Sequence, residues 1–114
     1  MPIFIEALGD NNELIRWEAA KALANVPDPS AVDPLTRALN NPAESKNVRV
    51  AAADALRHYH NLIAARALVN TLGGKDFGIA WQARQSLTAM TGNDLRYDEH
   101  AWLEFLTSEK KPLG

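Results

Sequence analysis

Two short sequence elements alternate along the chain, and both return at nearly the same interval. The first has a large apolar residue followed four positions later by leucine, as in FIEAL (4–8), LTRAL (35–39), LVNTL (68–72) and WLEFL (102–106). The second begins with isoleucine or valine and ends with leucine, as in IRWEAAKAL (15–23), VRVAAADAL (48–56) and IAWQARQSL (79–87). Successive starts lie 31, 33 and 34 residues apart for the first element, and 33 and 31 for the second. Agreement between two registers predicts a repeat architecture whose stacked units share one core.

Both elements have the spacing of helices. Apolar residues at 15, 19, 22, 23 and 26 follow the i, i+4, i+7, i+8, i+11 pattern of one helical stripe. Capping residues fit the same pattern: Asp28 precedes Pro29, Asp98 precedes the last helix, and Gly92 follows another. A second Asp-Pro at 33–34 indicates that this helix starts twice or kinks at Pro34. The expected helices are 2–9, 13–25, 29–41, 46–58, 61–72, 77–90 and 99–108.

Alanine occupies the fifth position of every second element, as Ala19, Ala52 and Ala83. Alanine buries little surface by itself. It suits a helix that is packed on both sides, because a small side chain lets neighbouring backbones approach closely. These three positions are therefore predicted to be close contacts between helices.

Composition excludes several classes of protein. The 114 residues suffice for one domain with a modest core. A net charge of −2, from 12 basic and 14 acidic residues, disfavours a generic nucleic-acid binder, and the absence of cysteine excludes disulfides and thiolate metal sites. MPIFIEALGD lacks the pattern of a signal peptide, and no apolar run approaches the roughly 20 residues of a membrane span. We therefore expect no membrane association and, by default, a cytoplasmic protein.

The repeats resemble the bacterial HEAT-like repeats of the phycobilisome-lyase type, which are armadillo-type α-solenoids. VRVAAADAL matches the V-R-x-x-A-A-x-A-L of that family's second helix, and DPSAVDPLTRAL (28–39) matches its first helix. LTAMTGNDLRYDEHAWLEFL (87–106) resembles a segment that closes such arrays. The resemblance implies an all-α fold, a short right-handed α-solenoid of about 3.5 helix-pair repeats and about seven helices, with the second helices lining a concave face. Residues 1–114 then form one domain, with units at about 2–26, 29–58 and 61–90 and a closing helix at 99–108.

The sequence departs from the family at one position. Arg16 and Arg49 begin two of the second helices, but the third has Ala80 there. The arginines could clamp an anion, or they could form a structural ladder that bonds to loop carbonyls and to acids of adjacent repeats. The second interpretation is favoured.

Three residues share the third position of the second helices: Trp17, Val50 and Trp81. This position points roughly 200° away from the position of Ile15 on a helical wheel. One hypothesis is an apolar stripe on the concave face that binds a protein or peptide partner. The alternative is that these residues pack against neighbouring helices. A polar rim to the stripe would consist of Lys21, Asp54, Arg57 and Arg84.

The histidines give the only grouping that resembles a metal site. His58 and His60 are two residues apart and do not share a helical face, and His100 lies far along the chain. No His–Glu pair at i, i+4 is expected beside them. A position at a helix end, where an imidazole can bond to carbonyl groups, is the favoured account. No metal, cofactor or catalytic residue is predicted.

The two ends of the array differ in their expected roles. Trp102, Phe105 and Leu106 are expected to cap the C-terminal end, with help from Leu95 and Tyr97. At the other end, the apolar residues of the first helix exceed what one stripe can hide. They predict either self-association with a second copy of the chain or a place in a longer repeat array. These residues are Ile3, Phe4, Ile5 and Leu8.

The sequence favours a non-enzymatic protein–protein interaction or scaffold module that binds its partner on the concave face. The alternative is an accessory or lyase-type subunit of an enzyme that modifies a chromophore or a protein. A ligand-sized pocket with converging polar groups would support it. A HEAT-like DNA-binding protein is a third, less favoured possibility, and a contiguous basic concave surface would support that function.

Overall fold

The computed structural model describes residues 2–108 and 112–113, which form only helices, turns and loops. Each of the seven predicted helices is present in these residues, with ends shifted by a few positions. The helices are α1 (Pro2–Ala7), α2 (Glu13–Asn25), α3 (Val32–Asn40), α4 (Lys46–Leu56), α5 (Leu62–Val69), α6 (Phe77–Thr91) and α7 (Glu99–Leu106), and a 3₁₀ turn, η1 (Pro29–Ala31), precedes α3.

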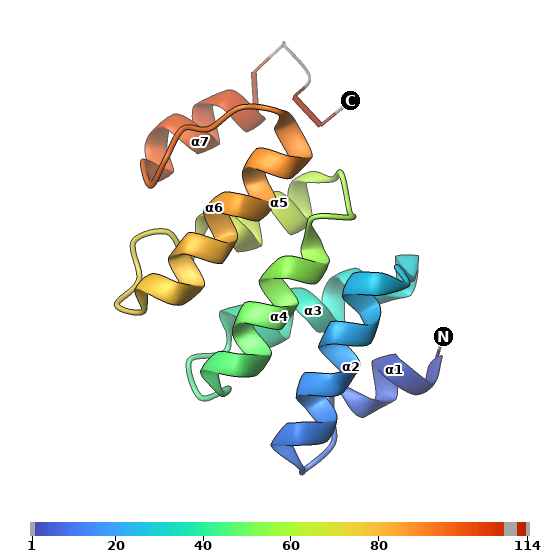
Figure 1. Ribbon diagram of the computed structural model, residues 1–114. Helices are drawn as coiled ribbons and strands as arrows, with labels where there is room; N and C mark the ends of the chain where they lie inside the picture. The colour runs from blue at the N-terminus through green and yellow to red at the C-terminus, as the bar shows by residue number, and fades with distance from the viewer. Residues whose placement is uncertain (1, 109–111, 114) are drawn as a thin grey trace.

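The helices form two layers (Figure 1). α2, α4 and α6 lie side by side in one layer, with α4 packed against both of the others. The other layer contains α1, α3, α5 and α7, in which α3 packs on α5 and α5 on α7. Each unit thus contributes one helix to each layer. The molecule is a short α-solenoid, as the sequence predicts.

Side-chain caps begin most of the helices. The side chains of Asn12, Ser45, Asn61, Asp76 and Asp98 each accept a hydrogen bond from a backbone N–H in the first turn of the helix that follows. These caps satisfy amide groups that have no partner within the helix. Local sequence therefore determines where the helices start.

Two other predicted signals act locally. Asp28 caps η1 with Pro29 in its first turn, and α3 then begins at Val32 with Pro34 still in the first turn, where proline forfeits no helical hydrogen bond. The helix therefore starts twice. Gly92 ends α6 in the left-handed conformation, with φ of 75°, which glycine adopts without steric cost.

The alanines at the fifth position of the second helices are buried. Ala19, Ala52 and Ala83 all belong to the core, as expected for positions where helices approach each other closely. The predicted stripe on α2 is wrong at its two ends, because Ile15 is 43% exposed and Val26 is 57% exposed. Val26 follows the last residue of the helix, and Ile15 faces the side of α2 on which no preceding unit lies.

At the C-terminal end, α7 packs on α5. Trp102 is completely buried, and its Nε1–H donates a hydrogen bond of 2.7 Å to the carbonyl of Arg96. Leu106 is buried too, and Phe105 packs on Trp102 with 6.4 Å between ring centroids. Leu95 and Tyr97 are partly buried against the same core. The predicted C-terminal cap is confirmed.

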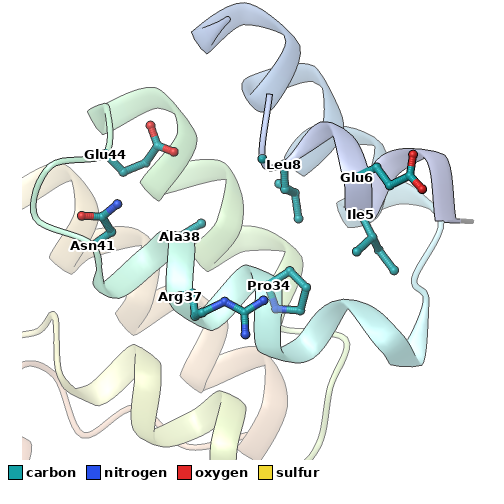
Figure 2. Close-up of a pocket in the computed structure, with 9 residues that line it drawn as sticks. Ile5, Glu6, Leu8, Pro34, Arg37, Ala38, Asn41 and Glu44 are labelled. Carbon is teal, nitrogen blue, oxygen red and sulfur yellow. The ribbon is translucent and has the colours of Figure 1, made fainter. Parts of the chain in front are cut away.

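The N-terminal helix hides more of its apolar side chains than the sequence suggests. Leu8 belongs to the core, and Ile5 is half-buried against α3, where both line a hollow with Pro34 (Figure 2). Phe4 is half-buried, whereas Ile3 is 63% exposed. The expected self-association surface therefore loses Leu8 and most of Ile5, because these two side chains face α3.

Candidate functional site

An open groove of about 410 Å³ runs across the layer of second helices. It contains four of the seven residues that the sequence nominates: Trp17, Lys21, Val50 and Asp54. α2 supplies two of them and α4 the other two. The remaining lining residues are Lys46, Asn47, Ala51, Gly78 and Gln82.

Trp17 and Val50 form the apolar part of the groove. Both are half-buried, and both pack against the core while they line the groove. The packing interpretation thus holds for the inner side of these side chains, while their outer side is open to the groove. Lys21 covers the Trp17 ring, with 4.2 Å between Nζ and the ring centroid, and also pairs with Glu18 at 2.7 Å. Such a cation–π contact restrains the indole ring in the groove.

A short polar network fixes the other side of the groove. Asp54 accepts a hydrogen bond from Arg57 and one of 3.5 Å from Gln82 Nε2. Gln82 also donates to Ser86 Oγ at 3.4 Å, and the buried Ser86 hydroxyl donates to the Ala53 carbonyl at 2.7 Å. The network links α4 to α6. Arg57 thus contributes by holding the Asp54 carboxylate, although it does not line the groove.

Trp81 lies outside the groove lining and is 47% exposed. The third position of each second helix faces the next unit along the array, so Trp17 faces α4 and Val50 faces α6. No further second helix follows α6, and Trp81 therefore faces open space. The side of α6 that faces α4 presents Gly78 and Gln82 instead. The repeat alignment could have identified Gln82, because it corresponds to Ala51 of the second unit.

Arg84 has a structural partner at the C-terminal end. Its Nε and one terminal nitrogen donate to the two carboxylate oxygens of Asp94, at 2.9 and 2.6 Å, and its guanidinium lies over the Tyr97 ring at 5.1 Å. These donors, with the backbone N–H of Arg96, lower the pKa of Asp94 to about 2. Arg84 ties α6 to the segment that leads into α7.

The two arginines that begin second helices form the structural ladder. Arg16 makes two hydrogen bonds of 2.9 Å to the carboxylate of Glu44 and one of 2.8 Å to the carbonyl of Asp10, and Arg49 donates to the Leu39 carbonyl at 2.8 Å. Burial by itself would raise the pKa of Glu44, but the hydrogen bonds from Arg16 and from the Ser45 N–H outweigh it and leave that pKa below its usual range.

The histidines also have structural positions. His58 at the end of α4 contacts the carbonyl of Ala24 through Nε2, as expected for a residue at a helix end. His100 pairs with Glu104, four residues further on, at 3.0 Å on the outer face of α7, so the expectation that no His–Glu pair of this spacing is present is wrong. Within residues 2–108 and 112–113, no three His, Cys, Asp or Glu residues are grouped so as to hold a metal ion.

A family model that describes HEAT repeats matches residues 1–88. The chain belongs to the HEAT-repeat family. The match covers the helices α1 to α5 and most of α6, and it therefore includes every residue of the groove. A search among curated proteins found no relative that matches the chain. HEAT repeats are generally non-catalytic and commonly serve as scaffolds for protein interactions. In the part of the chain that the structure describes, no helix has the length and apolar character needed to cross a bilayer.

Proposed function

We propose that this HEAT-repeat protein is a non-enzymatic interaction module that holds a segment of a partner protein in the groove between α2, α4 and α6. The observation that supports it best is the convergence of Trp17 and Val50 at the floor of a groove of about 410 Å³, beside the Asp54 carboxylate and the Lys21 ammonium. Half-buried aromatic residues with a polar rim are typical anchors for a partner side chain. The segment should therefore carry one large apolar residue between polar neighbours.

Charge on this surface favours a protein over a nucleic acid. The lysines and arginines near the groove have acidic neighbours: Lys21 pairs with Glu18, Lys46 with Asp76, and Arg57 with Asp54. Interleaved signs do not produce the continuous basic surface that phosphate binding requires. Membership of the phycobilisome-lyase type of repeats, a function as an accessory subunit and a bacterial origin are a second, less favoured proposal. A cytoplasmic location is also only proposed.

A peptide library displayed on phage tests the proposal. Peptides selected on the wild-type protein should contain a recurrent large apolar residue. Their affinity should fall about 30-fold or more for Trp17→Ser, which removes the anchor, and for Asn47→Tyr, which fills the groove from an exposed position. Trp81→Ser serves as the matched control, because it removes an exposed tryptophan outside the groove, and it should change the affinity less than about threefold.

Circular dichroism must show that the helix content of each variant equals that of the wild type. If no peptide is enriched on the wild type, or if Trp17→Ser and Trp81→Ser weaken binding equally, the groove is not the binding site.

A further inference from the structure

The N-terminal end of the array exposes an apolar surface that the rest of the fold does not cover. We call it the N-terminal face. It surrounds a groove of about 500 Å³ whose walls and floor are mainly hydrocarbon. The residues that define it are Ile3, Phe4, Leu14 and Ile15 on the walls, with Ala19 and Ala22 on the floor.

The internal repeats show what this kind of surface does. Ile15 corresponds to Val48 and Ile79 in the next two units, and the exposed fractions of the three side chains are 43%, 0% and 3%. Val48 and Ile79 are covered by the preceding unit, and within the described residues no unit lies before Ile15. The N-terminal face therefore has the chemistry of a contact between units but has no unit packed on it.

The face is also more apolar than its internal counterparts. Leu14 is 60% exposed, while the corresponding residues of the following units are Asn47 and Gly78. Glu18 is the single ionisable residue in the groove lining, and Lys21 pairs with it at 2.7 Å. A terminal repeat that ends an array in water ordinarily presents a polar outer face. α7 does so at the other end, with Glu99, His100 and Glu104 exposed.

We propose that the N-terminal face binds the same face of a second copy of this chain across a two-fold axis. The C-terminal end is a poorer match, because α7 buries Trp102. The segment from Asp94 to Tyr97 also packs on α6 through Arg84 and Phe77, although Phe77 and Trp81 stay exposed. Head-to-tail stacking of copies is therefore disfavoured, and pairing of identical faces closes the assembly at two copies. A groove with an alanine floor between large apolar walls is self-complementary, since the walls of one copy fill the groove of the other.

The end of the molecule is large enough for a small interface. The molecule measures 40 × 29 × 17 Å and its units stack along the longest dimension (Figure 1). The end section of 29 × 17 Å amounts to about 490 Å² per copy, or about 980 Å² for two copies. This is close to the ~1,000 Å² at which specific interfaces begin. An interface at this lower limit of size is typical of a weak association.

Sedimentation velocity between 1 and 500 µM tests the proposal. The wild type should pass from monomer to dimer. Leu14→Glu should raise the dimer Kd by tenfold or more, because it places a charge on the face. Ile63→Glu is a close control, since Leu14 and Ile63 both occupy the second position after an asparagine cap and are 60% and 61% exposed. Glutamate is favourable at this position in either helix, so both variants should fold.

The geometry is checked by spin labels on cysteines placed at exposed sites, which the cysteine-free sequence makes simple. In the dimer, labels at Asn11 should lie nearer to each other than labels at His100, because α7 lies at the end of each copy that is distant from the interface. A wild type that stays monomeric at 500 µM overturns the proposal. So does a dimer that Ile63→Glu weakens as much as Leu14→Glu, or one in which the His100 labels are the closer pair. The groove that binds the partner shares no lining residue with this face, so the two proposals fail independently.

Discussion

The first and second units of the array have closely similar sequence patterns but different surroundings, and their corresponding residues differ accordingly. Ile15 lies in the first turn of the second helix of one unit and is 43% exposed, while Val48 lies in the first turn of that of the next and is fully buried. The first helices differ in the same way, since Phe4 is half-buried and Leu35 is buried completely. In a solenoid the same motif is a core element or a surface element according to whether a neighbour precedes it.

The two ends of the molecule extend the comparison. Trp102 occupies the position in α7 that Phe4 occupies in α1, and it is completely buried with its indole N–H bonded. One end is closed by a helix with a polar outer face, and the other presents an apolar face. Substitutions at corresponding positions therefore test whether the place of a residue in the array determines its contribution to the free energy of unfolding.

The largest difference is expected between Trp102→Ala and Phe4→Ala. Loss of the buried indole leaves a large cavity and should lower the free energy of unfolding by about 3–5 kcal/mol. Phe4→Ala should cost less, about 2 kcal/mol, because part of that ring is already exposed. Urea denaturation of both variants measures the two values. Equal losses would mean that the two ends are equally important to the fold.

Replacing a small side chain by a large one should also destabilise the protein more in the second unit than in the first. Ala52 is completely enclosed, so Ala52→Leu should reduce stability by about 1–3 kcal/mol. Ala22 lines the open N-terminal face, and Ala22→Leu should change stability by less than about 0.5 kcal/mol. Thermal and urea unfolding at low protein concentration provide the measurement. A loss for Ala22→Leu as large as that for Ala52→Leu would show that the face is closed in the monomer.

The smallest effect concerns the ion pairs that join neighbouring segments near the two ends. The pKa of Asp94 is about 2 in the folded chain, below the ~3.9 of an unfolded chain. A lowered folded pKa means that Asp94 contributes its full stabilisation above pH 4, and that this contribution is lost as the pH falls from about 4 to 2. The pKa of Glu44 is lowered too, so its contribution disappears in the same direction.

Stability measured in urea between pH 6 and pH 2 checks both groups. Asp94→Asn and Glu44→Gln should each flatten the decline at acid pH relative to the wild type. A variant whose stability falls as steeply as that of the wild type would exclude its carboxylate as a source of the pH dependence.

The sequence by itself determined the repeat, the positions of the helices and the residues that start and stop them. These features depend on neighbours within a few residues along the chain. Asp98 caps the helix that follows it, and Gly92 ends the helix before it. The alanine of the repeat, Ala52 in the second unit, is buried in each unit. The apolar and aromatic residues of the closing segment were also sufficient to predict the C-terminal cap.

Only the tertiary structure decided which side of each helix is covered and which residues meet across units. A repeat motif predicts a contact side, but the ends of an array lack the neighbour that would use it. Ile15 was therefore assigned wrongly to the core, Leu8 wrongly to the surface, and the α6 side of the groove proved to be Gln82 rather than Trp81. Long side chains such as Arg84 choose among partners that only folding brings near, and Asp94 lies ten residues away in the chain. Burial and pairing depend on the presence of a neighbour in space, and the sequence pattern alone does not contain this information.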